Sequence, residues 1–260
     1  MPAGAHIHAG KILLAKARLA AQAGDETEAL RLTGLVGNLA DRLHDLDVPN
    51  LQTETASLGL ERVLQQAIVR HFLPTIGKQA DLKRWRPLIE REGRYDPQEL
   101  AKVMRGEFHT TSRDLLLPMI LDERNRLRPR DGMAVARAYA ASFDQWVRSM
   151  DSAGLKDLQA DPGLEQTWNN SHASAEGRRI LDTLFVSSPA WSKGFVRMSY
   201  RAGLNHTVLD LAAAEQRGER VEERGKELSG GAYVFDSPQR MVSLSASIAV
   251  PGVEPVALPW

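Results

Sequence analysis

Apolar residues recur at alternating spacings of three and four along most of the chain, with polar residues between them. This spacing is typical of helices that bury one face. The clearest row follows Asp25 and comprises Leu32, Val36, Leu39, Leu43 and Leu46. On the same grounds we expect helices over about 11–23, 133–150, 178–186 and 190–216, a helix from Asn50 to near Pro74, a shorter one around 82–89 that Pro87 interrupts, and one from Asp96 toward Leu115.

Two sharp boundaries separate these predicted helices, and the first is at Gly24. Glycine can adopt the left-handed conformation that ends a helix, and Asp25 can accept hydrogen bonds from the free amides of the next helix. Glu28, three residues later, is placed to bond back to the Asp25 amide and to complete a capping box. The junction predicts an antiparallel helical hairpin near the N-terminus.

The second boundary is Asp96-Pro97, an N-cap residue followed by proline at the first helical position. Gly106 lies inside the helix that this pair begins, where glycine costs about 1 kcal/mol relative to alanine. We interpret Gly106 as the point where another helix comes close, with Glu107 hydrogen-bonded across the contact. A binding or catalytic role for the Glu107 carboxylate is the alternative.

The character of the chain changes after Gly218. Segments 232–236 and 241–248 have the composition of β-strands, and the second alternates apolar and small polar residues. The residues between them form a predicted turn, so we expect a β-hairpin that packs on a helix. The tail over 251–260 contains several prolines, and we expect it to be extended and anchored by Trp260.

Together these elements predict a mainly α-helical fold, an irregular helical bundle or short superhelix with a small C-terminal β-hairpin. We expect a flexible N-terminus over 1–10, a helical domain over 11–217, and a hairpin with an extended tail over 218–260 packed on that domain. The turn at Gly24 also raises the alternative of a tetratricopeptide array. The period of about 34 residues and the Trp-Leu-Gly-Tyr pattern of that array are absent, so we favour a single irregular domain.

Composition narrows the classes of function. Lys and Arg together number 33, as do Asp and Glu, so the 260-residue chain has a formal charge of zero and attracts neither nucleic acid nor anionic membranes overall. The absence of cysteine excludes disulfides, thiolate catalysis and cysteine-bound zinc. No apolar run approaches the roughly 20 residues that span a bilayer, and residues 1–8 lack the regions of a signal peptide. The location stays open between the cytoplasm and, if an anchor precedes Met1, the periplasm or cell envelope.

Several short stretches carry a resemblance to one family. They are Ala17-Arg18-Leu19 with Gly24-Asp25 and Ala29, the helix after Pro49, Met104 to Phe108, and Leu211 to Glu215 followed by Gly218, Leu228 and a strand pair around Asp236. Together they resemble an uncharacterised group of bacterial helical proteins that often carry a single N-terminal membrane anchor. That group usually has a Tyr-Pro and an Asp-Pro near its C-terminal end, where this chain has Glu223-Arg224 and Asp236-Ser237. The resemblance implies a helical fold and an envelope location, and it implies no catalytic residue.

Histidines and carboxylates supply the candidates for chemistry. Glu107 and His109 are close in sequence, although residues two apart on a helix point in different directions. His172 lies in the polar stretch 168–174, which is where we would look first for a ligand pocket. His6 and His8 form an alternating pair, which we assign to a frayed terminus. No His-Glu-x-x-His pair, phosphate-binding loop or dinucleotide motif occurs, so we expect no metal and no cofactor.

Two basic clusters, over 83–94 and 124–130, could contact phosphate or an acidic partner, but intervening acidic residues favour a solvated surface. The leading hypothesis is a non-catalytic interaction or scaffold domain that binds a protein partner and no nucleic acid, and that contacts a membrane only through a segment outside this chain. One alternative is a hydrolase-like enzyme that assembles Glu107, His109 or His172 with an arginine from distant helices. A second alternative is nucleic-acid binding through the basic clusters.

Overall fold

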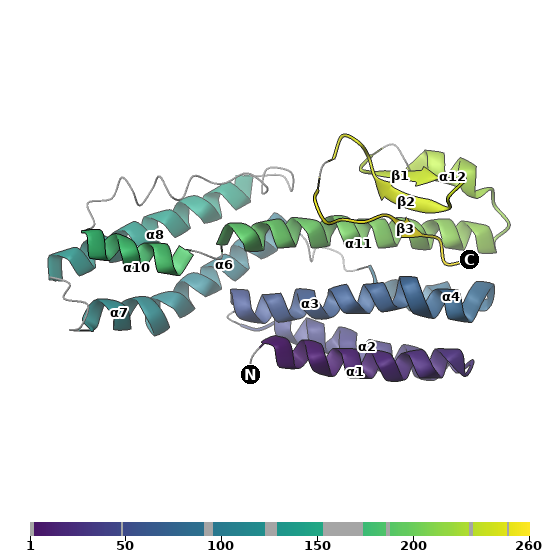
Figure 1. Ribbon diagram of the computed structural model, residues 1–260, viewed down its shortest axis with the longest axis horizontal. Coiled ribbons are helices and arrows are strands. Elements are labelled where there is room, and N and C mark those ends of the chain that lie inside the picture. The colour runs from purple at the N-terminus through teal and green to yellow at the C-terminus, as the bar shows by residue number, and fades with distance from the viewer. Residues whose placement is uncertain are drawn as a thin grey trace. The chain divides into compact units, whose positions relative to one another are not determined.

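The computed structural model describes residues 3–47, 49–90, 96–122, 129–152, 174–185, 188–228, 231–248 and 250–260. Helices make up most of these residues, and a small antiparallel sheet lies near the C-terminus (Figure 1). The fold is therefore mainly α-helical, which confirms the class that the apolar spacing predicted.

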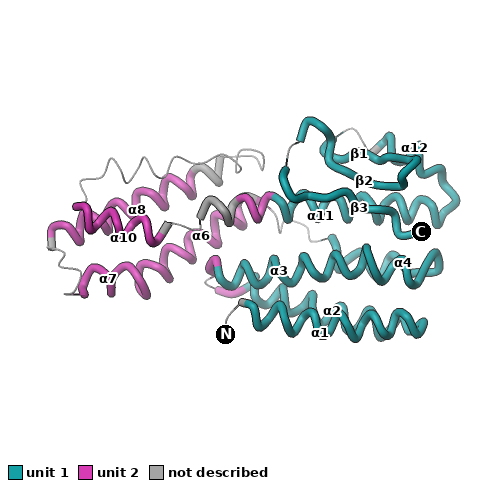
Figure 2. Tube along the Cα trace, viewed as in Figure 1, with its two compact units in different colours: residues 1–45, 52–92, 197–260 teal, residues 46–51, 93–196 magenta. Residues whose placement is uncertain are grey.

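The chain divides into two compact units, which Figure 2 shows in different colours. Unit 1 comprises residues 1–45, 52–92 and 197–260, and unit 2 comprises residues 46–51 and 93–196. The division differs from the single helical region over 11–217 that we expected. Apolar periodicity reports which face of a helix is buried but not which other helix covers it, so it could not separate the two units.

Unit 1 is built mainly from helices that meet at short turns. Its elements are α1 (Ala3–Gln22), α2 (Glu26–His44), α3 (Leu51–Ala67), the π-helical turn η1 (Ile68–Phe72), α4 (Leu73–Ile76), the 3₁₀ turn η2 (Gly77–Gln79), α5 (Leu82–Trp85), the 3₁₀ turn η3 (Arg86–Leu88), most of α11 (Ser188–Gln216), and α12 (Val221–Leu228). The predicted short helix around 82–89 is thus split into α5 and η3 at the residue before Pro87.

The N-terminal helix α1 begins at Ala3 rather than near Lys11. In place of a flexible terminus, residues 3–10 form the first turns of this helix and pack on α3. A Cβ atom at Gly10 would lie 2.4 Å from Cδ2 of Leu60, and one at Gly59 would lie 2.6 Å from Cδ1 of Ile7. Glycine on each helix lets the two backbones approach closely, which is a long-range contact that local sequence does not reveal.

The junction of α1 and α2 has the predicted left-handed glycine and N-cap. Gly24 has a φ of +79°, and the amide of Asp25 donates to the carbonyl oxygen of Ala20 at 2.9 Å. Asp25 Oδ1 accepts from the amide of Glu28 at 2.9 Å and so caps α2. The Glu28 carboxylate does not bond back to the Asp25 amide and pairs with Arg31 instead. The capping box is therefore only half formed, because Ala20 already accepts from the amide that Glu28 would need.

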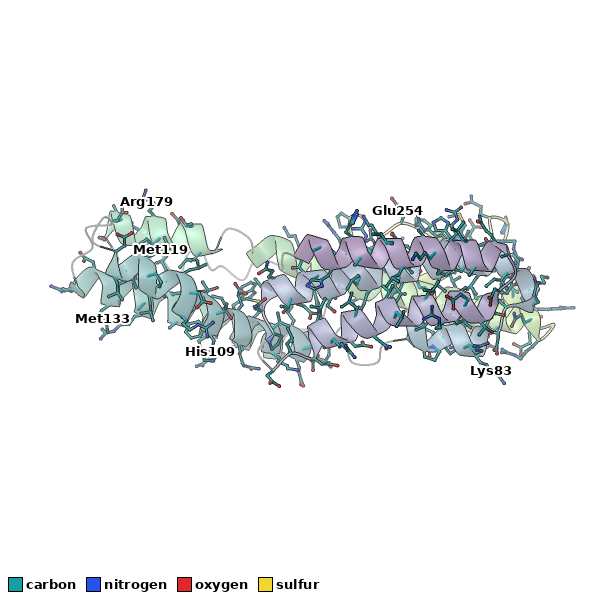
Figure 3. The ribbon with its side chains drawn as sticks, turned by 90° about the horizontal axis from the view of Figure 1, so that it is seen from below. Lys83, His109, Met119, Met133, Arg179 and Glu254 are labelled. Carbon is teal, nitrogen blue, oxygen red and sulfur yellow. The ribbon has the colours of Figure 1, made fainter. Side chains whose placement is uncertain are left out.

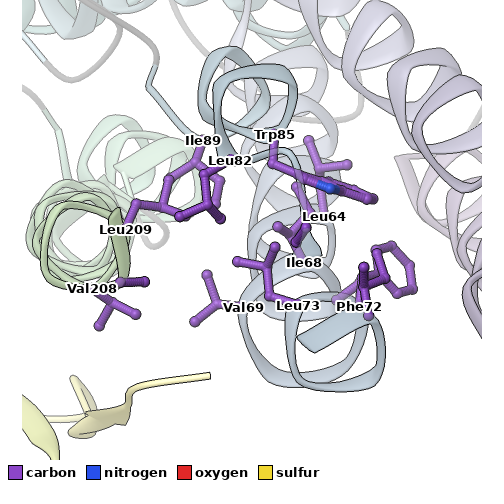
Figure 4. Close-up of a cluster of buried hydrophobic side chains, with 14 of the residues drawn as sticks. Leu64, Ile68, Val69, Phe72, Leu73, Leu82, Trp85, Ile89, Val208 and Leu209 are labelled. Carbon is purple, nitrogen blue, oxygen red and sulfur yellow. The ribbon is translucent and has the colours of Figure 1, made fainter. Parts of the chain in front are cut away.

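The core of unit 1 gathers apolar side chains from α1 to α5, α11 and the sheet. Leu64, Ile68 and Phe72 lie on the α3–η1 segment beside the fully buried Trp85 (Figure 4). The ring centroids of Phe72 and Trp85 are 5.7 Å apart. Trp85 Nε1 donates to Oε1 of Glu26 at 2.8 Å, so the one polar atom of this buried ring has a partner.

A π-helical turn precedes a proline at two places, one in each unit. At η1 the amide of Leu73 donates to the carbonyl oxygen of Ile68, and η4 (Ser112–Leu116) has the same pattern of bonds five residues apart. Pro74 and Pro118 follow these turns. Proline has no amide to donate, and in an α-helix its ring clashes with the carbonyl group four residues earlier. A π turn disrupts the regular bonding at this point, so the helical path continues through both prolines.

Unit 2 contains the second predicted boundary. Its elements are α6 (Pro97–Thr111), η4, α7 (Leu117–Leu121), α8 (Pro129–Ser152), α10 (Ala175–Phe185) and the first residues of α11. Asp96 caps α6 as predicted, because its Oδ1 accepts from the amide of Gln98 at 2.8 Å and Pro97 is the first helical residue. The predicted helix over 133–150 begins earlier, at Pro129, since proline also fits the first turn there.

Aromatic side chains form the contact between α6 and α8. The ring centroids are 5.6 Å apart for Phe108 and Tyr139, 4.8 Å for Tyr139 and Phe143, and 5.9 Å for Phe143 and Trp146. The three aromatic residues of α8 are buried, and their spacings of four and three residues place them on one face of the helix.

The small sheet is antiparallel, in the order β1 (Tyr233–Asp236), β2 (Met241–Leu244) and β3 (Val256–Ala257). The hairpin of β1 and β2 was predicted, but β2 ends at Leu244 rather than near Ile248. The tail supplies a third strand, since Val256 pairs with Val242.

The first strand packs on two helices where each has a glycine. A Cβ atom at Gly203 of α11 would lie 1.8 Å from the hydroxyl oxygen of Tyr233. A Cβ atom at Gly225 of α12 would lie 2.7 Å from a ring carbon of Phe235. The sheet therefore covers α11 and α12 at very short range, as expected for a hairpin that needs a helix to pack on.

Candidate functional site

Gly106 and Glu107 lie where α6 meets the segment that leads into α3. A Cβ atom at Gly106 would lie 1.7 Å from the carbonyl oxygen of Pro49, so a larger residue requires that backbone to move. Glu107 Oε2 accepts from the amide of Leu51, the first residue of α3, at 2.9 Å. The glycine marks a close approach with Glu107 bonded across it, and the neighbour is the backbone before α3 rather than the side of another helix.

The second oxygen of Glu107 continues a series of polar contacts. Oε1 accepts from Oγ1 of Thr111 at 2.8 Å. Burial raises the pKa of the nearby Tyr139 phenol, a hydrogen bond with Thr111 opposes the rise, and the charge of Glu107 adds to it. Both carboxylate oxygens of Glu107 thus have partners that stabilise the local fold of unit 2.

Among the described residues, no histidine candidate is hydrogen-bonded to Glu107. His109 is exposed on α6 (Figure 3), and it shares no hydrogen bond with Glu107 in the described part of the chain. His6 and His8 lie within α1. His172, like most of the stretch 168–174, lies outside the described residues.

An ion cluster between η3 and α11 joins Arg86, which belongs to the basic cluster over 83–94, to three side chains that sequence reasoning missed. Arg86 Nη2 donates to Oδ1 of Asp210 at 2.7 Å, and Arg86 Nη1 donates to Oε1 of Glu90. His206 Nε2 lies 2.9 Å from Oε1 of Glu90 and 3.4 Å from Oδ2 of Asp210. His206 and Asp210 are four residues apart on α11, which was a visible signal, but their approach to Arg86 depends on the tertiary fold.

The ion cluster has the donor atoms of a metal site but already contains a cation. Glu90, His206 and Asp210 offer ligand atoms within 4.8 Å of one another, a set that suits zinc. Partial burial disfavours the charge of Arg86, but hydrogen bonds and charges from Asp210 and Glu90 outweigh burial and raise its pKa. A metal ion would have to displace this guanidinium group, so we interpret the cluster as a link that fastens η3 to α11.

Buried polar pairs attach α3 to its neighbours in unit 1. His44 Nδ1 of α2 lies 2.9 Å from Oε2 of Glu54, and both residues are buried. Asn205 Nδ2 of α11 donates to Oε1 of Gln65 at 3.0 Å. Such pairs are costly to leave unmatched in a low-dielectric interior, so they help to select one packing arrangement of these helices.

Comparisons with known proteins found no relative. No family model, no curated protein and no solved structure matches the chain. Among the helices in the described ranges, none combines the length and the apolar content that crossing a bilayer requires. The chain is thus defined here by its fold as a mainly α-helical protein, and its resemblance to anchored bacterial helical proteins stays a prediction.

Proposed function

We propose that the protein is a non-catalytic interaction domain that binds a protein partner through an apolar surface of unit 2. This surface, the unit 2 apolar surface, comprises Leu117, Leu121 and Met133 of α7 and α8. Leu121 is 75% exposed, Leu117 is 50% exposed and Met133 is 56% exposed. Figure 3 labels Met133. Isolated exposed leucines are ordinary, but several on adjoining elements are typical of a binding surface.

The arrangement of α7 and α8 supports treating these side chains as one surface. A Cβ atom at Gly132 of α8 would lie 2.6 Å from Cγ2 of Ile120, so the two helices are in close contact. Leu117 and Leu121 are four residues apart on α7 and therefore share a face. Met133 directly follows the glycine at which α8 contacts α7.

The environment of Glu107 supports a non-catalytic role over the enzyme hypothesis. Leu51 and Thr111 occupy its two oxygens, and a general acid or base must instead reach the proton that it transfers. The envelope location is part of the proposal and rests on the resemblance to anchored helical proteins. The coding sequence upstream of Met1 tests the location directly, since an apolar span of about 20 residues there would supply the anchor.

Site-specific photo-crosslinking in living cells tests the interaction. A photoreactive amino acid at position 121 of the full chain should give discrete adducts with a protein partner. The same amino acid at Arg137, an exposed position of α8 in the same unit, is the matched control. Replacing Leu117 with serine should reduce the adducts formed from position 121. The proposal fails if position 121 gives no adducts, or if it gives the same adducts as position 137.

Hydrolytic activity of the purified protein would contradict the proposal that the domain is non-catalytic. If the purified full chain hydrolyses esters, phosphoesters or peptides, and Glu107→Gln or His172→Ala abolishes that activity while the protein stays folded, then the enzyme hypothesis is correct. Circular dichroism of each variant separates a lost reaction from a lost fold.

A further inference from the structure

Four arginines of unit 1 gather around the C-terminal tail where it passes α11. They are Arg62 of α3, Arg70 of η1, and Arg197 and Arg201 of α11, and we call them the arginine cluster. Arg201 Nη2 donates to the carbonyl oxygen of Gly252. Arg70 Nη2 lies 3.4 Å from Oε2 of Glu254, which Figure 3 labels.

Arg197 and Arg62 complete the cluster. A Cβ atom at Gly252 would lie 3.7 Å from Nε of Arg197, so this guanidinium group lies against the same stretch of tail. Burial lowers the pKa of Arg201, the positive charges of Arg62, Arg197 and Arg70 lower it further, and Glu254 opposes them. Three other guanidinium groups thus act on Arg201 against the carboxylate of Glu254, in a chain whose total charge is zero.

Some surface arginines elsewhere in unit 1 each have a carboxylate of their own. Arg31, Arg220 and Arg224 each pair with a glutamate three residues away on the chain. Within the described ranges, by contrast, Arg62 and Arg197 form no ion pair, although both are exposed. Their donor groups are accessible to a molecule from solution.

We propose that the arginine cluster binds a phosphate group. A guanidinium group is planar and always charged, and its paired N–H groups match the spacing of phosphate oxygens. A doubly charged phosphate would neutralise the excess positive charge of the cluster more fully than chloride does. The exposed position of Arg62, Arg70 and Arg197 leaves room for a phosphomonoester in solution or for the phosphate of an anionic lipid headgroup.

Calorimetric titration of the full chain with glycerol 3-phosphate, at low ionic strength, tests the proposal. Arg62→Gln and Arg197→Gln should each weaken binding by about tenfold or more, the usual loss for a hydrogen bond to a charged group. Glu254→Gln should tighten binding, because it removes the carboxylate that competes with phosphate for Arg70. Arg220→Gln is the matched control, since Arg220 is an exposed arginine of the same unit, and it should bind as the unaltered protein does.

A second arm separates the two sources of phosphate. Vesicles of phosphatidylcholine with and without phosphatidic acid are sedimented with the full chain and with the same variants. Binding to glycerol 3-phosphate alone identifies a soluble phosphomonoester, and binding to phosphatidic acid vesicles alone identifies a headgroup. The proposal is overturned if the protein binds neither, or if the cluster variants and Arg220→Gln lose the same amount of binding. Both replaced arginines of the cluster are exposed, so circular dichroism should show unchanged helix content.

Discussion

Replacing Gly106 with alanine gives the sharpest test of the contact between α6 and the start of α3. A methyl group at this position would lie 1.7 Å from the carbonyl oxygen of Pro49 and 2.9 Å from its carbonyl carbon. The Pro49 backbone must therefore move by well over 1 Å to restore an ordinary van der Waals contact of 3.4–4 Å. That movement carries the Leu51 amide away from Glu107.

The change in the free energy of unfolding follows from one stabilising effect and two destabilising ones. Alanine favours the helix by about 1 kcal/mol over glycine. Overpacking costs about 1–3 kcal/mol, and the loss of a hydrogen bond to a charged carboxylate costs about 1.5–3 kcal/mol. The net expectation is a loss of roughly 1.5–5 kcal/mol in the free energy of unfolding of unit 2.

Urea denaturation followed by circular dichroism measures this loss. Gly34→Ala is the matched control, because Gly34 lies inside α2 and an added Cβ atom would meet nothing within 4 Å. The control should be stabilised by up to about 1 kcal/mol. The double variant Gly106→Ala/Glu107→Gln should cost little more than Gly106→Ala alone, since the two residues share one contact. A Gly106→Ala protein that gains stability as the control does would refute the close approach.

Three further predictions concern unit 1. Asp25→Ala should lower the free energy of unfolding by about 1 kcal/mol through loss of the N-cap of α2, measured by urea denaturation, and an unchanged midpoint would contradict the cap. Burial raises the pKa of Glu215, but hydrogen bonds and charges from Lys78 and Arg240 outweigh burial and lower it below the ordinary value of 4.5. Because its folded pKa is lowered, the carboxylate stabilises the fold above pH 4.5, and this stabilisation is lost as the pH falls through the folded pKa. The melting temperature measured from pH 6 to about pH 3 should therefore fall less steeply in Glu215→Gln than in the unaltered protein. Equal slopes in the two proteins would argue against a stabilising role of this carboxylate. Trp85→Phe should cost about 2–4 kcal/mol from a cavity and an unpaired Glu26, and a near-neutral result in thermal unfolding would mean that the core relaxes around the change.

Much of the helical fold could be predicted because its signals are local. The apolar row of α2 and the aromatic face of α8 need only the helical repeat, and Asp25 and Asp96 need only their own next turn. Glu28 shows the limit of local prediction. Its carboxylate has the right spacing for a capping box, but the Asp25 amide donates to the carbonyl oxygen of Ala20 in the preceding helix. The end of α1 and the capping box of α2 both require this amide, and the sequence alone does not show which of them forms.

The candidate site was less predictable because its contacts join distant parts of the chain. Gly106 indicated that something must come close, yet its neighbour Pro49 and the Glu107 partner Leu51 are more than fifty residues away in sequence. The arginine cluster had no sequence signal at all, since α3 and α11 contribute members that only the fold brings together. The basic clusters identified from the sequence, over 83–94 and 124–130, contain no member of the arginine cluster.

The π-helical turns at η1 and η4 have a consequence for how this chain tolerates change. Each turn holds one residue more than an α-helix would, and the π bulge absorbs that residue within a single turn. A residue that was not absorbed would rotate all that follows by about 100° about the helix axis. After η1, Leu73 and Ile76 are both buried, so the bulge keeps them directed into the core. Deleting one residue of η1 would let the chain return to regular α-helical bonding, with a kink at Pro74 but with the same downstream phase. Inserting a further residue would turn Leu73 and Ile76 away from the core, so this stretch should tolerate a one-residue deletion far more readily than a one-residue insertion.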